Sequence, residues 1–124
     1  MTKEELKKVR EVLVRARARI EDPARWCRGK YARNRSGEPV SAGNVEAWSF
    51  CAIGSLMAET NSQWHEHAPY ARGHIFLREA AEQLYGNPLV STVNDGAGHG
   101  AVMAIYDRAI NQTLDEEAAM AGVE

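Results

Sequence analysis

The chain has 124 residues, of which 44% are hydrophobic and 26% charged, with a formal net charge of −2 and two cysteines. These proportions exclude a wholly disordered chain, and the length predicts a single domain over residues 1–124 whose core needs no metal or disulfide. The longest uncharged apolar run, 47–58, is too short to span a bilayer and residues 1–5 lack the apolar stretch of a signal peptide, so we expect a cytoplasmic protein with free thiols.

The first predicted element is an amphipathic helix over residues 4–20. Its apolar residues recur at alternating spacings of three and four, which places them on one face. Thr2 and Glu5 have the spacing of a capping box at the helix start. Asp22 and Pro23 end the helix and begin a short turn over 23–27.

A short hairpin is predicted next, from residues 30–34 and 38–41, with Gly37 supplying the turn. Asn44 is then expected to cap a helix over 47–58 that is apolar almost all round and therefore buried on most sides. Gly54 inside this helix indicates the close approach of another element.

The second half predicts two more helices, over residues 70–85 and 99–114. Gly86 and Pro88 end the first of these. Between the helices, 89–93 is expected to be a small strand or an extended connection, and 94–98 a tight loop. The acidic segment 115–124 is expected to fray. The predicted fold is therefore mainly α (α+β), with about four principal helices around one core and a small β-hairpin.

The net charge hides an asymmetry along the chain. Residues 1–35 carry twelve Lys and Arg against five Asp and Glu, a balance of +7, whereas residues 36–124 carry three against twelve, a balance of −9. Basic residues in such a block either contact an acidic partner or pair with the protein's own acidic half. The predicted partner-binding residues are Arg10, Arg15, Arg17, Arg19, Arg28, Lys30, Arg33 and Arg35.

Several short motifs carry a family resemblance. They are Trp26-Cys27-Arg28-Gly29, Ala32-Arg33, Cys51-Ala52-Ile53-Gly54-Ser55-Leu56 and Asn94-Asp95. In these motifs the chain resembles an uncharacterised family of small bacterial and bacteriophage proteins, a domain of unknown function, over roughly residues 5–112. The chain departs from the family pattern at Asn34, at the spacing of Trp48 and Cys51, and at Val93. The resemblance implies a fold but no activity.

Three kinds of chemical site were weighed. Cys51, His99, Asp95 and Asn94 are the candidates for a thiol-dependent hydrolase, which needs a base beside the thiol. Against that reading, Cys51 is expected inside an apolar helix, where a thiol is inert. A metal site would draw on His65, His67, His74 and a cysteine, but their spacing matches no known ligand motif, so no metal and no cofactor is predicted. Glycines after Asp95 suit a turn better than a phosphate.

The function predicted from these patterns is a non-enzymatic, macromolecule-binding protein of phage or mobile-element type, with another protein as its partner. Two alternatives stay open. One is nucleic-acid binding through the basic N-terminal segment, and the other is a thiol-dependent hydrolase.

Overall fold

The computed structural model describes residues 1–60 and 69–121, and within them the fold is mainly helical with a small sheet, as predicted. The helices are α1 (Lys3–Arg19), α2 (Ala52–Thr60), α3 (Pro69–Tyr85), α4 (Val90–Ala97) and α5 (His99–Ala121). A short 3-10 turn, Pro23–Arg25, follows α1. The strands are β1 (Ala32–Arg33), β2 (Pro39–Val40) and β3 (Ser49–Phe50).

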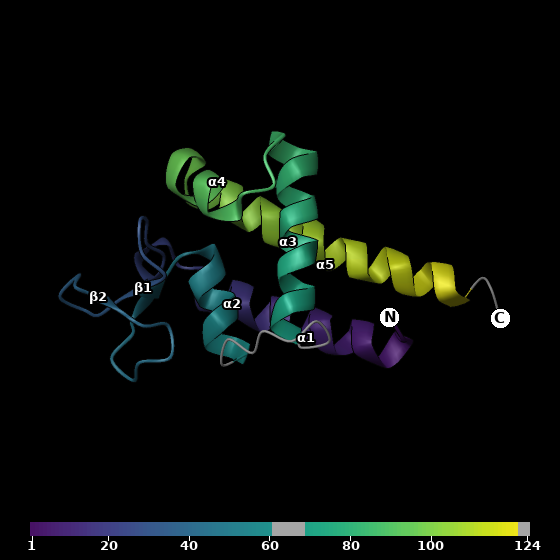
Figure 1. Cartoon of the computed structure of the whole chain (residues 1–124), viewed down its shortest axis with the longest axis horizontal. Helices are drawn as coiled ribbons and strands as arrows, with labels where there is room; N and C mark the ends of the chain where they lie inside the picture. The colour runs from purple at the N-terminus through teal and green to yellow at the C-terminus, as the bar shows by residue number, and fades with distance from the viewer. Residues whose placement is uncertain (61–68, 122–124) are drawn as a thin grey trace.

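The helices form one packed group with the sheet at its edge. Helices α1 and α5 pack against each other, α3 crosses and contacts both, and α2 packs on α1 and α3 (Figure 1). The small sheet lies at one end of the molecule, while the start of α1 and the last turns of α5 lie at the other (Figure 1). No helix in the described part of the chain is long and apolar enough to cross a membrane.

Helix α1 forms where its sequence pattern predicts. The Thr2 side chain accepts a hydrogen bond from the Glu5 backbone N–H, and the Glu5 carboxylate accepts one from Thr2, which completes the capping box. The apolar face is buried against α2, α3 and α5 through Leu6, Val9 and Leu13. Asp22 then accepts from the Ala24 N–H and begins the predicted turn.

The predicted hairpin is present but it belongs to a three-stranded antiparallel sheet. Strand β1 lies in the centre, with Ala32 opposite Val40 of β2 and Phe50 of β3. The expected helix over 47–58 is therefore wrong in its first part, because residues 49–50 pair with β1 and α2 begins only at Ala52. Asn44 caps a turn instead, accepting from the Glu46 N–H.

Two predictions for the second half are also wrong. Residues 90–97 form helix α4 rather than a strand followed by a loop, because Val90, Val93 and Asn94 share a buried helical face. Gly98, with φ of +97°, ends the helix where a side chain would be strained. Helix α5 begins at His99, as predicted, but it continues through 115–121, which was expected to fray.

Candidate functional site

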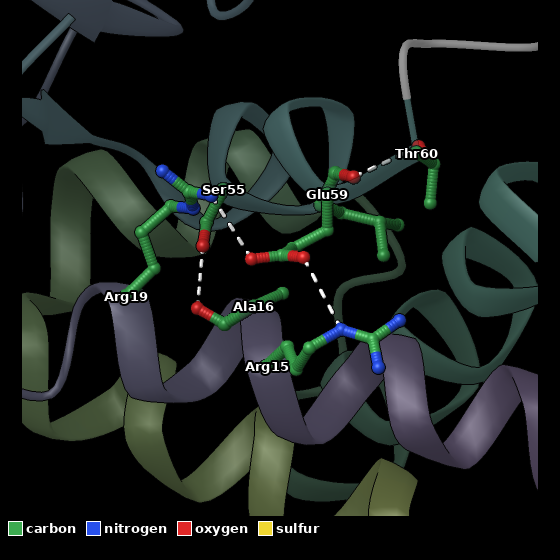
Figure 2. A network of polar contacts seen from close by, with 7 residues as sticks. Arg15, Ala16, Arg19, Ser55, Glu59 and Thr60 are labelled. Carbon is green, nitrogen blue, oxygen red and sulfur yellow. Dashed lines mark hydrogen bonds and ion pairs between the residues drawn. The ribbon is translucent and has the colours of Figure 1, made fainter.

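Half of the predicted partner-binding residues pair with the protein's own carboxylates. Between α1 and α2, Arg15 and Arg19 both reach Glu59, at 3.3 and 3.0 Å (Figure 2). Beside them the Ser55 hydroxyl donates to the Ala16 carbonyl (Figure 2). Glu59 is mostly buried, with 16% of its side chain exposed. These arginines therefore join the two helices.

Arg10 and Arg17 make the corresponding contacts with α5. Arg17 lies 2.7 Å from the Asp107 carboxylate and 3.0 Å from Glu21, and Arg10 lies 2.8 Å from Glu117. The hydrogen bonds that Arg17 donates to the Asp107 and Glu21 carboxylates raise its pKa above the ordinary value. Part of the charge asymmetry along the chain is thus neutralised inside the fold.

A second basic group has no such partners. Within the described residues, no carboxylate pairs with any cation of the segment 25–35. Several of these cations stack on tryptophan rings, and Arg33 donates to the carbonyls of Gly37 and Arg28. We call this group the basic surface; its members are Arg25, Arg28, Lys30, Arg33 and Arg35.

The arginines of the basic surface are held in place by aromatic contacts. The guanidinium groups of Arg25 and Arg35 lie 4.9 and 5.6 Å from the ring centroid of Trp48, and that of Arg28 lies 5.1 Å from Trp26. Such stacking fixes a guanidinium group while leaving its N–H donors available to an anion. Lys30 is exposed.

Next to the basic surface, Asn94 forms the centre of a buried polar network. Its Oδ1 accepts from the Trp26 indole N–H at 2.7 Å and from the Ala52 backbone N–H at 3.0 Å. Its Nδ2 donates to the Cys27 carbonyl at 3.1 Å and to Asp95 at 3.0 Å. Asn94 is fully buried, and its amide makes all four of these bonds. It therefore joins α4 to the start of α2 and to residues 26–27.

Asp95 follows Asn94 on α4 and lines a hollow of about 440 Å³. Its Oδ1 accepts from the Gly29 N–H at 2.9 Å, so the carboxylate is tied to residues 26–29 and does not pair with Arg33. The other walls of the hollow include Lys30, Tyr31, Cys51 and Ser91. A hollow of this size is within the usual range for small-ligand sites.

The geometry does not assemble the candidate hydrolase site. Cys51 precedes α2 rather than lying inside a helix, which corrects its predicted place, and its Sγ accepts from the Gly54 N–H at 3.3 Å. Burial raises the pKa of the Cys51 thiol to about 11. Within the described residues His99 contacts other groups: its Nε2 lies 2.7 Å from the Ile20 carbonyl and its ring packs edge-on against Trp26. Cys27 is also buried, and both cysteines are free.

No three His, Cys, Asp or Glu side chains of residues 1–60 and 69–121 cluster closely enough to hold a metal ion. Of the histidines weighed as ligands, His65 and His67 lie outside the described residues. His74 is half-buried on α3, and burial together with nearby Arg78 lowers its pKa.

Sequence reasoning missed Tyr31 and Ser91, which both line the hollow. The Tyr31 side chain is 53% exposed. Its signal in the sequence is an aromatic residue among the cations of the basic surface, a pattern typical of nucleic-acid contacts. Ser91 could not be recognised from the sequence. Its four-residue spacing to Asp95 places the two side chains on one face only if the segment is helical, and the segment was not predicted to be a helix.

Comparison with known proteins supports an uncharacterised family. The sequence matches the model of a family of unknown function, DUF6197, over residues 4–112. Neither a curated protein nor a solved structure matches the chain. Because the family model covers most of the sequence, the chain belongs to the DUF6197 family, which agrees with the expectation of an uncharacterised family.

Proposed function

We propose that this protein is a non-enzymatic, macromolecule-binding protein, and that nucleic acid is the partner that its basic surface fits best. The observation that carries the proposal is the segment 25–35, where five cations lie without a carboxylate partner among the described residues. The phage or mobile-element setting stays a prediction from the family resemblance.

The arrangement of charge favours this surface over helix α1. The α1 arginines already form ion pairs with Glu59, Asp107 and Glu117, so binding a partner through them would require those ion pairs to break. The basic surface needs no such rearrangement, because stacking on Trp26 and Trp48 holds several of its guanidinium groups in place. Fixed cations lose less side-chain entropy when they contact phosphates.

Aromatic residues favour nucleic acid over an acidic protein. Tyr31 offers a half-exposed ring directly beside Lys30, and stacked bases with nearby cations are the usual way in which single strands are bound without a groove. A protein partner, the first prediction from the sequence, would use the same cations but would have no need of the ring.

The proposal is tested by titrating a fluorescent single-stranded oligonucleotide at several salt concentrations. We expect the affinity to fall about tenfold to hundredfold between about 50 and 200 mM salt, because four or five cations displace counterions from the strand. The double variant K30E/R35E should lose most of this affinity. Neither Lys30 nor Arg35 pairs with a carboxylate in the described part of the chain, so the variant is expected to fold normally.

The matched control is K3E/K8E, which changes the net charge equally but lies on the exposed side of α1. It should bind within about twofold of the unaltered protein, because its charges are removed from the contact surface and screened by salt. Absence of strand binding at 50 mM salt would overturn the nucleic-acid proposal. Binding of poly-glutamate in its place would identify an acidic protein as the partner.

A further inference from the structure

Two hollows meet at the Tyr31 side chain. The first, of about 440 Å³, extends from Tyr31 toward Lys30 and Asp95, and the second, of about 340 Å³, extends toward Arg78 and Leu89. Ser91 of α4 lines both. Tyr31 and Ser91 therefore lie at the boundary of the two hollows, and the first of these also has the Lys30 cation and the Asp95 carboxylate in its lining.

Tyr31 is rigidly supported from below. Its carbonyl accepts from the Cys51 N–H at 3.1 Å, and Gly54 packs so closely that a Cβ there would lie 1.8 Å from the Tyr31 oxygen. The backbone of Tyr31 is therefore pressed against the first turn of α2, while its side chain remains 53% exposed. A half-exposed ring on a fixed backbone is a preorganised surface for stacking a flat ligand.

The Asp95 carboxylate has a defined orientation and one oxygen to spare. Its Oδ1 accepts from Gly29 and from Asn94, whereas no donor among the described residues bonds its Oδ2. An ionised carboxylate only accepts hydrogen bonds, so a ligand in the hollow must bring a donor. Ser91 lies one helical turn before Asp95 and adds a hydroxyl on the same side.

We propose that the hollow between Tyr31 and Asp95 takes one unstacked guanine base of a bound strand. The base stacks on Tyr31, its neighbouring N1–H and N2–H₂ groups both donate to the free Oδ2 of Asp95, and Lys30 contacts the adjacent phosphate. This inference rests on the proposed nucleic-acid function and adds a base preference to it.

Guanine is the base whose hydrogen-bonding edge fits a carboxylate. Its two donors lie side by side and can converge on the two lone pairs of Asp95 Oδ2, the oxygen that Gly29 and Asn94 leave free, whereas adenine and cytosine each offer a single amino group on that edge and uracil a single imino group. A good bidentate pair discriminates against the wrong base by about fivefold to a hundredfold. A phosphate, by contrast, would be repelled by Asp95, so the anionic part of a nucleotide belongs beside Lys30.

The test compares two oligothymidine strands that differ in one central base, guanine or adenine, at low salt. We expect the guanine strand to bind at least fivefold more tightly. GMP alone should shift the backbone amide resonances of Gly29 and Ser91, whereas AMP, CMP and UMP should shift them much less. Gly29 reports on the pocket because its N–H is bonded to Asp95.

Variants separate stacking from base recognition. Asp95→Asn keeps the Oδ1 that accepts from Gly29 but replaces the spare acceptor with a donor, so it should abolish the guanine preference while leaving the salt-dependent strand binding. Tyr31→Ala should lower the affinity for both the guanine and the adenine strand about fivefold or more, because the stacking ring is lost. Tyr31→Trp, which keeps an aromatic ring, should bind like the unaltered protein. The matched controls are Asp115→Asn and Tyr85→Ala, at exposed positions of α5 and α3. They should change neither the affinity for the strands nor the preference for guanine.

The outcomes distinguish this inference from the proposed function. Equal binding of the two strands, with no shift of Gly29 or Ser91 by GMP, would overturn the guanine site even where salt-dependent strand binding persists. Shifts of the same resonances by arginine amide but not by GMP would overturn it in favour of a cationic ligand. Loss of all strand binding would instead overturn the proposed function itself.

Discussion

At the scale of single residues, Asn94 links more segments of the fold by side-chain hydrogen bonds than the residues next to it do. Its amide bonds link α4 to the Trp26 indole, the Cys27 carbonyl and the first amide of α2. Since Asn94 is fully buried, water does not reach the site to replace its amide, so removing the side chain leaves those donors and acceptors without a hydrogen-bond partner. The Asn-Asp motif therefore has a structural role through Asn94 and an exposed group in Asp95.

We expect Asn94→Ala to lower the free energy of unfolding by about 2–4 kcal/mol, through several unsatisfied buried groups and a small cavity. Urea denaturation followed by far-UV circular dichroism measures it. Asn111→Ala is the matched control, because Asn111 is exposed on α5 and both changes gain the same helix propensity. An equal effect of the two variants would show that the network contributes nothing to stability.

The burial of Cys51 predicts that the stability of the folded protein depends on pH. Burial raises the pKa of its thiol from 9.0 to about 11, so the folded protein holds the proton more tightly than the unfolded chain does. The resulting stability is complete below about pH 9 and is lost as the pH rises toward 11. Iodoacetamide should therefore fail to label native Cys51 at pH 7.5 and should label it in urea.

Cys51→Ser is the informative comparison for this pH dependence. A serine hydroxyl still accepts from the Gly54 N–H and caps α2, but it does not titrate in this range. The variant should show a shallower loss of stability between pH 9 and 11, measured by thermal unfolding across that interval. Rapid alkylation of native Cys51 at neutral pH would contradict the burial argument and revive a reactive thiol.

At the scale of elements, the start of α2 is the point where the sheet and the helices meet. The backbone of Tyr31, the residue before β1, approaches α2 so closely at Gly54 that only a residue without a Cβ fits, which confirms the close packing predicted there. Beyond this contact, the Ser55 hydroxyl and the Glu59 carboxylate hold α2 against α1.

Gly54→Ala should lower the free energy of unfolding by about 1–3 kcal/mol, because the new Cβ meets the Tyr31 backbone rather than a movable side chain. Gly100→Ala, in the first turn of α5, is the opposite case. Apart from its chain neighbours and the nearby backbone of its own helix, no atom of the structure lies within 4 Å of the new Cβ, so Gly100→Ala should stabilise by about 0.5–1 kcal/mol. Chemical denaturation of both variants checks the pair, and a stabilised Gly54→Ala would disprove the close approach.

The sequence predicted helices α1 and α3, the start of α5 and the hairpin, since apolar periodicity and capping residues act locally. The sequence-based prediction failed at residues 47–50 and 89–97, where contacts with residues distant in the sequence determine the secondary structure. The apolar run before Cys51 pairs with β1 by hydrogen bonds that periodicity does not reveal, and Val90 and Val93 lie in a helix despite their β-branching. Tyr31 and Ser91 joined the candidate site for the same reason: only tertiary packing brings them together.

At the scale of the whole molecule, the basic first quarter and the acidic remainder partly neutralise each other. The pairs of α1 with Glu59, Asp107 and Glu117 use charges that are far apart in the sequence. The cations of the basic surface have no such pairs among the described residues, and their segment lies at the sheet end of the molecule (Figure 1). The charge asymmetry thus holds α1 against α2 and α5, and it leaves the cations of the basic surface without a carboxylate partner among the described residues.

Helix α5 is held by this pairing beyond the residues that the family model matches. Arg10 and Glu117 are mostly buried, at 17% and 22% side-chain exposure, and lie 2.8 Å apart. Glu117→Gln should lower the free energy of unfolding by about 1–2 kcal/mol, since it leaves Arg10 without its counter-charge. Asp115→Asn, at an exposed position on the same helix, should have almost no effect in the same urea titration. Equal values would mean that this end of α5 is not held by the ion pair.

The Asn94 network also has a consequence for hydrogen exchange. The amide protons of Ala52 and Gly29 are bonded not to backbone carbonyls but to side chains on α4. Their protection therefore reports whether α4 is docked, and both should exchange with the same opening free energy although they lie in different elements. Through Asn94 and Asp95, we therefore expect α4, the start of α2 and the 26–29 segment to open together as a single unit.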